Sequence, residues 1–199
     1  MIKFVYFDVG GVVIKDFSKT NKWEELRVAK SISKQDFDEL RGKLSMGQIN
    51  LNEVGLSLND FISRYDTNKS IWPIIVGIKK KYKIGLLTNQ YRGLLEAIVN
   101  ANLMPVIDWD VTIDSSIEGV KKPDPKIYEI AEKSAEFSGS EILFVENGEK
   151  HIKTAQEFGW QTFLYDSSNY EKSSQNLAKV FDRLKLLESD EELVTISGN

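Results

Sequence analysis

The stretch "IKFVYFDVGGVV", residues 2–13, decides the fold of this chain. Residues 2–7 are almost continuously apolar, which is typical of a strand buried on both faces of a parallel sheet. The run ends in a carboxylate, Asp8, and the glycines Gly10 and Gly11 then permit a tight turn. Ligands of open parallel sheets bind beyond the carboxyl ends of the strands, so an acid in this place is a candidate for chemistry.

Short apolar runs alternate with helical periodicity further along the chain. Four more runs have the length and composition of strands, at residues 83–88, 109–113, 141–146 and 161–165. Strands that alternate with helices are typical of an α/β fold with a parallel sheet, which we therefore predict. We also expect a last amphipathic helix over residues 171–187 and a loosely ordered tail after it.

Residues 17–70 differ from the rest in having helical stripes and few strand signals. The two stripes consist of Phe37, Leu40 and Leu44, and of Leu58, Phe61, Ile62 and Tyr65. Ser33 is the expected N-cap of the first helix, and we interpret both stripes as helix packing. The sequence therefore predicts a core formed by residues 1–16 and 71–199, with a small helical unit, residues 17–70, inserted after the first strand.

Composition excludes several classes of function. The 199 residues are 41% hydrophobic and 28% charged, which is ordinary for a folded globular chain. The net charge of -4 argues against nucleic acid as the main partner. There are no cysteines, which excludes disulfides and thiolate metal sites and favours a reducing cytoplasm. No uncharged apolar run reaches the roughly 18 residues of a membrane span, and Asp8 interrupts the apolar N-terminus, so we expect neither a membrane partner nor a signal peptide.

Polar residues end several of the predicted strands. They are Asp8, Thr88, Asn89, Ser115, Glu146 and Asn147. The carboxyl ends of parallel strands meet at one edge, so these side chains should converge there. Asp8 is suited to attack phosphorus and form an aspartyl-phosphate, while the following backbone N–H groups cradle the phosphate oxygens. The alternative is that Asp8 caps the next turn.

Other polar residues admit both a catalytic and a plain structural interpretation. Lys122, in "KKPDP", would offset the charge of phosphate and carboxylate, or it is a solvated surface charge, as we expect of Lys121. Thr88 and Asn89 would donate hydrogen bonds to a phosphate, or they form an ordinary strand-to-helix turn.

Two further residues complete the set of candidates. Glu146 would bind magnesium, which prefers carboxylate oxygens and several waters, or it is an exposed acid at the end of a strand. The only histidine, His151, is expected at the surface near a helix start, without a partner for a catalytic pair.

These motifs, in this order, resemble the haloacid dehalogenase superfamily. "FVYFDVGGVV" with Asp8 looks like its first motif, and "IGLLTN" with Thr88 like its second. "SSIEGVKKPDPKIY" with Lys122 is similar to the Lys-Pro loop of one subgroup, and "LFVENGEKHIKTAQEFG" resembles the fourth motif. "MGQINLNEV" resembles a stretch in the helical cap of a phosphatase-like subgroup, whose first motif often reads "FDLGGVL" or "FDLGNV".

The resemblance implies a Rossmann-like three-layer core of parallel sheet and helices, with residues 17–70 as a cap that closes over substrate. It implies that Asp8 is the nucleophile, that Thr88 binds phosphate and that Lys122 stabilises the charged intermediate. It also implies that the backbone carbonyl of Gly10 contacts magnesium.

Several acids of the family pattern are missing here. Gly10 stands where most family phosphatases carry a second aspartate as general acid and base, a role typically worth about 10²- to 10⁴-fold in rate. Glu146, Asn147 and Lys150 stand where the family usually has aspartates. We expect Glu146 to ligate the metal, Asn147 to contact a metal-bound water without supplying charge, and Lys150 to weaken divalent binding.

Three hypotheses follow for the function. The first is a magnesium-dependent phosphatase that acts on a small phosphorylated metabolite through Asp8, with Mg²⁺ as cofactor. The second is a degenerate family member with a binding or regulatory role, because three acids are lost from one site. The third is a metal-independent 2-haloacid dehalogenase, a group that also lacks the second aspartate, although Glu146 would repel a carboxylate substrate.

Overall fold

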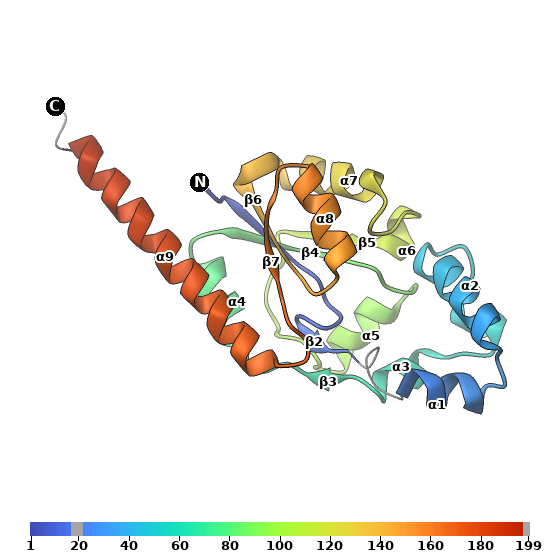
Figure 1. The fold of residues 1–199 in the computed structure, drawn as a ribbon. Helices are drawn as coiled ribbons and strands as arrows, with labels where there is room; N and C mark the ends of the chain where they lie inside the picture. Colours follow the sequence, from blue (N-terminus) through green and yellow to red (C-terminus); the bar gives the residue numbers. More distant parts are fainter. Residues whose placement is uncertain (17–21, 197–199) are drawn as a thin grey trace.

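The computed structural model describes residues 1–16 and 22–196, with side-chain environments for residues 1–16 and 24–184. Its centre is a five-stranded parallel sheet in the order β5-β4-β1-β6-β7 (Figure 1). The strands are β1 (Phe4–Phe7), β4 (Lys83–Thr88), β5 (Val111–Asp114), β6 (Ile142–Glu146) and β7 (Gln161–Leu164). The predicted α/β fold is confirmed, and β1, the middle strand, is buried as its continuous apolar character predicted.

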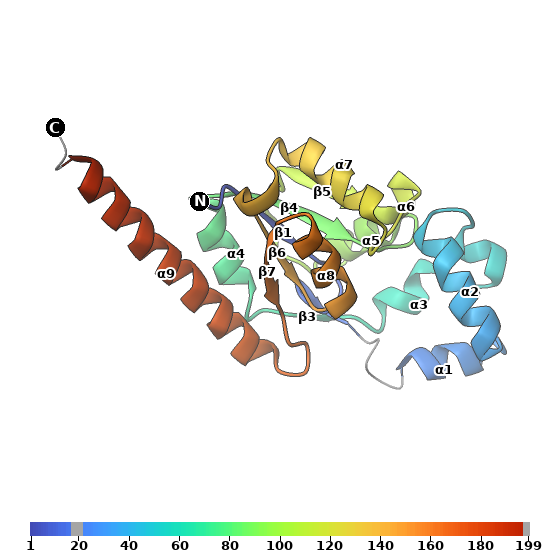
Figure 2. The same ribbon diagram turned by 45° about the horizontal axis from the view of Figure 1, so that its top comes forward.

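Helices cover both faces of this sheet and make the fold three-layered (Figures 1 and 2). They are α4 (Trp72–Lys79), α5 (Leu94–Asn100) and α9 (Tyr170–Ile196) on one face, and α7 (Pro125–Ala135) and α8 (Glu149–Glu157) on the other. Successive residues of a strand point to opposite faces. Val5 and Phe7 therefore enter one hydrophobic cluster, while Phe4 and Tyr6 enter the other. Burial on both sides explains why β1 contains no polar residue.

The predicted insertion forms a group of short helices at one end of the sheet (Figure 1, right). They are α1 (Lys22–Ala29), α2 (Lys34–Ser45), the 3-10 turn η1 (Leu51–Val54) and α3 (Leu58–Ile62). Ser33 caps α2 as predicted, because its hydroxyl accepts a hydrogen bond from the Asp36 amide at 3.1 Å. Tyr65 lies beyond the end of α3, so the second helix is shorter than its stripe predicted.

A small strand pair closes the base of this group, and the sequence did not predict it. Strand β2 (Ile14–Lys15) pairs antiparallel with β3 (Asp66–Thr67), so the chain enters and leaves the helical segment side by side. The boundaries of the cap at residues 17 and 70 stay a prediction, and residues 17–21 lie outside the described residues.

The remaining elements connect the layers. They are α6 (Ser115–Glu118) and the 3-10 turn η2 (Gly139–Glu141). The last helix differs from expectation, because α9 continues to Ile196, where the sequence predicted a loose tail after residue 187. Helix α9 packs against the segment that carries α4, with the rings of Tyr82 and Phe181 5.6 Å apart. Among the described helices, none is long and apolar enough to cross a bilayer.

Candidate active site

The structure brings three of the predicted residues into direct contact at the carboxyl edge of the sheet. Asp8 follows β1, Glu146 ends β6, and Lys122 reaches them from the loop after α6. The Lys122 Nζ lies 2.9 Å from Asp8 Oδ1 and 2.6 Å from Glu146 Oε2, and it also donates to the Leu87 carbonyl at 2.8 Å. The Lys122 side chain is 0% exposed, which excludes a solvated surface charge.

Glu146 is surrounded by donors on all sides. Its Oε1 accepts hydrogen bonds from the backbone N–H of Asn147 at 2.9 Å and of Gly148 at 2.8 Å. Its Oε2 contacts Lys122 and lies 3.2 Å from His151 Nδ1. The Glu146 side chain is 0% exposed, so it is not an exposed acid at the end of a strand. In this arrangement Glu146 is the buried counter-ion of Lys122.

The two carboxyl groups beside Lys122 have pKa values shifted in opposite directions. Burial, and then the negative charge of Glu146, raise the pKa of Asp8, although Lys122 acts in the opposite direction. Burial also opposes ionisation of Glu146, but Lys122 and His151 together hold the pKa of Glu146 well below its usual range. Lys122 is itself buried, yet Asp8 and Glu146 raise its pKa. The lysine therefore stays charged, while Asp8 is the carboxyl group that protonates first on acidification.

Asn89 holds the Lys122 loop in place. Its side-chain amide donates to the Lys122 carbonyl at 2.9 Å and accepts from the Lys122 N–H at 2.9 Å. Asn89 also lines the cavity described below. Thr88 is 1% exposed, and its hydroxyl accepts from the Gln90 side chain at 3.3 Å. The contacts of Thr88 and Asn89 with phosphate stay predictions.

Ser115 lies at the same edge but has a different environment. Its hydroxyl donates to the Ser45 carbonyl at the end of α2, and it accepts from the Gln90 N–H at 3.1 Å. Arg92 adds a hydrogen bond to the Gly47 carbonyl at 3.3 Å. Ser115 therefore links the helical segment to the core.

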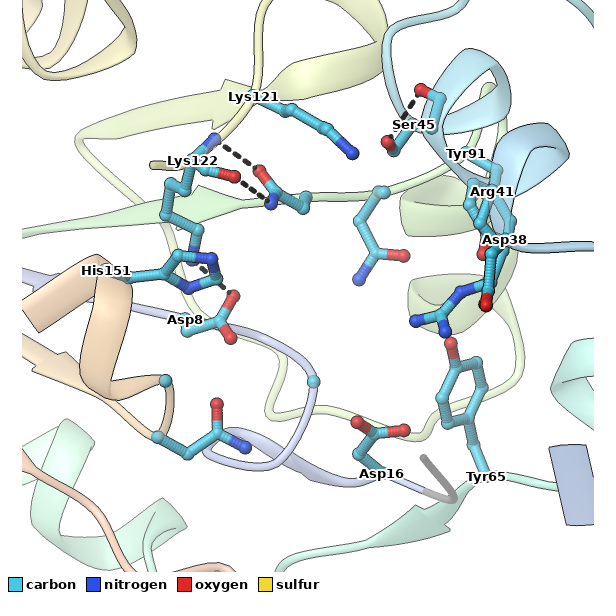
Figure 3. A pocket seen from close by; sticks show the side chains of 16 residues that line it. Asp8, Asp16, Asp38, Arg41, Ser45, Tyr65, Tyr91, Lys121, Lys122 and His151 are labelled. Carbon is cyan, nitrogen blue, oxygen red and sulfur yellow. Dashed lines mark hydrogen bonds and ion pairs between the residues drawn. The ribbon is translucent and has the colours of Figure 1, made fainter. Parts of the chain in front are cut away.

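A cavity of about 460 Å³ opens above Asp8 (Figure 3). Its floor consists of Asp8, Lys122, Asn147 and His151, and its wall consists of Asp38, Arg41, Tyr65 and Lys121. Three of the four wall residues come from the predicted cap. Lys121 lines this cavity and is partly exposed. His151 lies near the start of α8, as predicted, but the expectation that it has no partner is wrong, because it contacts the buried carboxylate of Glu146. One signal for this contact was available in the sequence, because His151 follows Glu146 by five residues and lies near a helix start.

Gly11 shows why the first turn requires a glycine. Its φ is +83°, in the left-handed region, and a Cβ there would lie 2.0 Å from Asn147 Nδ2. The Asn147 side chain therefore packs directly against the Gly11 backbone. This contact ties the turn after β1 to the turn after β6.

The donor set fits a magnesium ion only in part. Among the described residues, no three His, Asp or Glu side chains are grouped to hold a metal. A metal would have to displace three hydrogen-bond donors, from Lys122, Asn147 and Gly148, to reach Glu146. Asp8, the Gly10 carbonyl and the Asn147 amide remain as oxygen donors at the cavity. Magnesium commonly binds through one or two carboxylates together with substrate phosphates and water, so this set fits an ion that binds with a phosphate ester.

Comparison with known proteins agrees with this arrangement. Residues 69–159 match the family model of haloacid dehalogenase-like hydrolases. A D-ribitol-5-phosphate phosphatase of Bacteroides thetaiotaomicron is 25% identical to this chain, in an alignment that covers 82% of this chain and 91% of the relative.

Solved structures show the same fold. A haloacid dehalogenase family enzyme from B. thetaiotaomicron, in complex with magnesium and inorganic phosphate, superposes with a TM-score of 0.70 at 20% identity, covering 85% of this chain and 96% of that one. An L-2-haloacid dehalogenase from Xanthobacter autotrophicus superposes with a TM-score of 0.58 at 20% identity, covering 81% and 76%. The match over residues 69–159 and the shared fold make this chain similar to the haloacid dehalogenase-like hydrolases.

Proposed function

We propose that this protein hydrolyses phosphate monoesters of small metabolites, with Asp8 as the nucleophile. The observation that carries the proposal is the buried contact between Asp8 and Lys122 at the floor of an open, polar cavity. A buried lysine whose charge is maintained by two carboxylates is suited to offset the charge of an incoming phosphate. Lys122 also orients Asp8, because it contacts Oδ1 and leaves Oδ2 for attack.

The reaction divides into two displacements at phosphorus. In the first, an oxygen of Asp8 bonds to phosphorus while the ester bond breaks, and the alcohol leaves with a proton. In the second, water attacks the aspartyl-phosphate, phosphate leaves, and Asp8 is regenerated. The Lys122 ammonium remains beside Asp8 throughout and stabilises negative charge as it develops.

Magnesium belongs to this proposal as a cofactor that binds together with the ester. When bound, it would offset phosphate charge and help to orient the transferred group. Asp8, the Gly10 carbonyl and Asn147 would hold it, and Glu146 would stay with Lys122. The complex of a structural neighbour with magnesium and phosphate supports this part of the proposal.

The wall of the cavity favours a hydroxyl-rich substrate. It presents Asp38, Arg41, Lys121 and the ring of Tyr65, a mixture of hydrogen-bond donors and acceptors. A phosphorylated polyol or sugar would satisfy such groups, whereas a large apolar ester would not. The sugar-alcohol phosphatase among the relatives is consistent with this class.

The test is phosphate release from a panel of polyol and sugar phosphates, with magnesium and with a chelator. We expect release that requires magnesium and is abolished by Asp8→Asn, while the exposed Asp108→Asn variant behaves as the wild type. A folded wild type that binds these esters without hydrolysing them would instead establish the second hypothesis, a degenerate protein with a binding or regulatory role. The absence of acids at Gly10 and Asn147 favours that hypothesis. Turnover of 2-haloacids in chelator would establish the dehalogenase.

A further inference from the structure

We propose that Asp16 is the proton-transfer residue of this site, acting from beside the position where Gly10 has no side chain. The inference rests on the proposed phosphatase function and deepens it. A phosphate ester of an ordinary alcohol needs a proton on its leaving oxygen, and the later attack of water needs a base. Asp8 is the nucleophile in this scheme, so it supplies neither the proton for the leaving oxygen nor the base for water.

The chain folds back so that Asp16 returns to Gly10. The Gly11 N–H donates to the Ile14 carbonyl at 2.9 Å, and Gly10 and Ile14 form an isolated bridge. A Cβ built on Gly10 would lie 3.9 Å from both Cγ and Oδ2 of Asp16. The carboxylate of Asp16 therefore lies next to the space that a side chain at position 10 would enter.

The backbone around Asp16 is held in place from two sides. Strand β2, which ends at Lys15, pairs with β3. The Asp16 N–H donates to the Tyr170 hydroxyl at 3.2 Å. These contacts fix the Asp16 backbone relative to the core.

Asp16 also faces the correct part of the cavity. In an in-line displacement the leaving oxygen points away from Asp8, toward the cap. Asp16 lines the same cavity as Asp8, and Figure 3 shows its carboxylate directed inward on the side of Tyr65. Burial, and then the negative charge of Asp16, raise the pKa of Tyr65, which agrees with this placement.

The other titratable groups of the floor are less suited to transfer a proton. Lys122 is held charged by its two carboxylates, and the same contacts keep Glu146 ionised. His151 directs Nδ1 to Glu146 and lies on the floor, beside Asp8 rather than opposite it. Burial raises the pKa of Tyr91 and Tyr65 and makes them weaker acids.

The proton balance is as follows. Protonated Asp16 gives its proton to the alkoxide oxygen as the P–O bond of the ester breaks, so the product leaves as a neutral alcohol. The resulting Asp16 carboxylate takes a proton from the water that attacks the aspartyl-phosphate. Asp16 is then protonated again, and the net reaction is ester plus water giving alcohol plus phosphate.

The experiment compares two esters in the Asp16→Asn variant. A polyol phosphate needs the proton, whereas 4-nitrophenyl phosphate releases a stabilised phenolate that does not. We expect kcat/KM, which reports the first displacement, to fall about 10²- to 10⁴-fold for the polyol phosphate and much less for the aryl ester. The kcat of both esters should fall, because both form the same aspartyl-phosphate and need the same base for its hydrolysis. Asp38→Asn, which removes another cavity carboxylate, should change both esters by the same factor.

A second variant supplies the rescue. Gly10 is outside the left-handed region, and a Cβ there has no contact shorter than 3.9 Å, so the backbone accepts a side chain at this position. Gly10→Asp in the Asp16→Asn background should restore most of the polyol phosphate turnover. If Asp16→Asn does not fold, as judged from its thermal unfolding, Asp16→Ser takes its place in both measurements.

Each outcome decides the inference. An equal loss of kcat/KM for both esters would mean that Asp16 only positions its neighbours. A loss of kcat/KM selective for the polyol phosphate in His151→Gln, absent in Asp16→Asn, would transfer the role to His151. Either result overturns the assignment while leaving the phosphatase function intact. A wild type that hydrolyses neither ester would instead refute the proposed function itself, and the assignment with it.

Discussion

The floor and the wall of the cavity are built in different ways. On the floor, Lys122 and Glu146 are 0% exposed, and the polar contacts of Glu146 come from loops at the edge of the sheet and from His151 in the first turn of α8. On the wall, Asp38 and Arg41 are exposed and are carried by α2, outside the sheet. The difference indicates a division of labour in which the floor sets the chemistry and the wall selects the substrate. Four measurements test this division.

The adjacent lysines provide the sharpest contrast. Lys122→Met would leave Asp8 and Glu146 buried together without a cation, so we expect a loss of about 3–5 kcal/mol in the free energy of unfolding, and no activity. Lys121→Met should leave the free energy of unfolding within about 0.5 kcal/mol and change only KM. Urea unfolding and initial rates measure both. Similar stability of the two variants would contradict the division.

Alanine substitutions at Gly55 and Gly11 separate the free-energy cost of backbone strain from the cost of a steric clash. Gly55 has a φ of +70° and no atom within 4 Å of a Cβ, so Gly55→Ala should cost about 1 kcal/mol from backbone strain alone. Gly11 has a similar φ, but its Cβ would overlap the Asn147 side chain. Gly11→Ala should therefore cost clearly more and also reduce kcat, because the floor must shift. Equal thermal unfolding of the two variants would show that the Asn147 contact is unimportant.

Arg41 tests the wall alone. Arg41→Gln removes a charge from an exposed position, so we expect KM for polyol phosphates to rise about tenfold, the value of one charge-assisted hydrogen bond. The kcat should stay nearly constant, because the interaction is equal in the ground and transition states. Steady-state kinetics would refute this if kcat fell in parallel with kcat/KM.

The pH dependence probes the floor with the smallest perturbation. Burial raises the pKa of Asp8, so kcat/KM should fall on acidification at a pH above the ordinary range of aspartate, because a protonated nucleophile cannot attack. A raised pKa in the folded state also means that Asp8 contributes stability at low pH that is lost as the pH rises through that pKa. The Asp8→Asn variant should therefore gain stability relative to wild type as the pH rises. The opposite trend would mean that pairing with Lys122 outweighs burial.

Much of the fold and part of the floor were predictable from the sequence. The runs that became β1, β4 and β6 are apolar because they are buried on both faces, and such a pattern can be read directly. Asp8 and Glu146 were located because a polar residue ended each run. The α2 N-cap at Ser33 was also predictable, since capping depends on residues close in sequence.

The contacts that depend on tertiary structure were not predictable. The burial of Lys122 between two carboxylates joins segments more than 20 residues apart, and no local pattern records it. Asp16 was overlooked because its role depends on a turn that returns over Gly10, and a polar residue near a loop has no periodic signature. The extension of α9 to Ile196 had too weak an amphipathic pattern to be recognised.

The hydrogen bonds that Ser115 and Arg92 donate to the Ser45 and Gly47 carbonyls make a clasp between α2 and the core. The chain passes between the same two parts through the paired strands β2 and β3, and the rings of Phe61 and Tyr91, 5.1 Å apart, also pack α3 against the core. Two such bonds, at about 1 kcal/mol net each, would by themselves keep the unclasped form at a population on the order of a few per cent. Molecules in this unclasped form would allow products to leave the cavity without unfolding of any helix or strand.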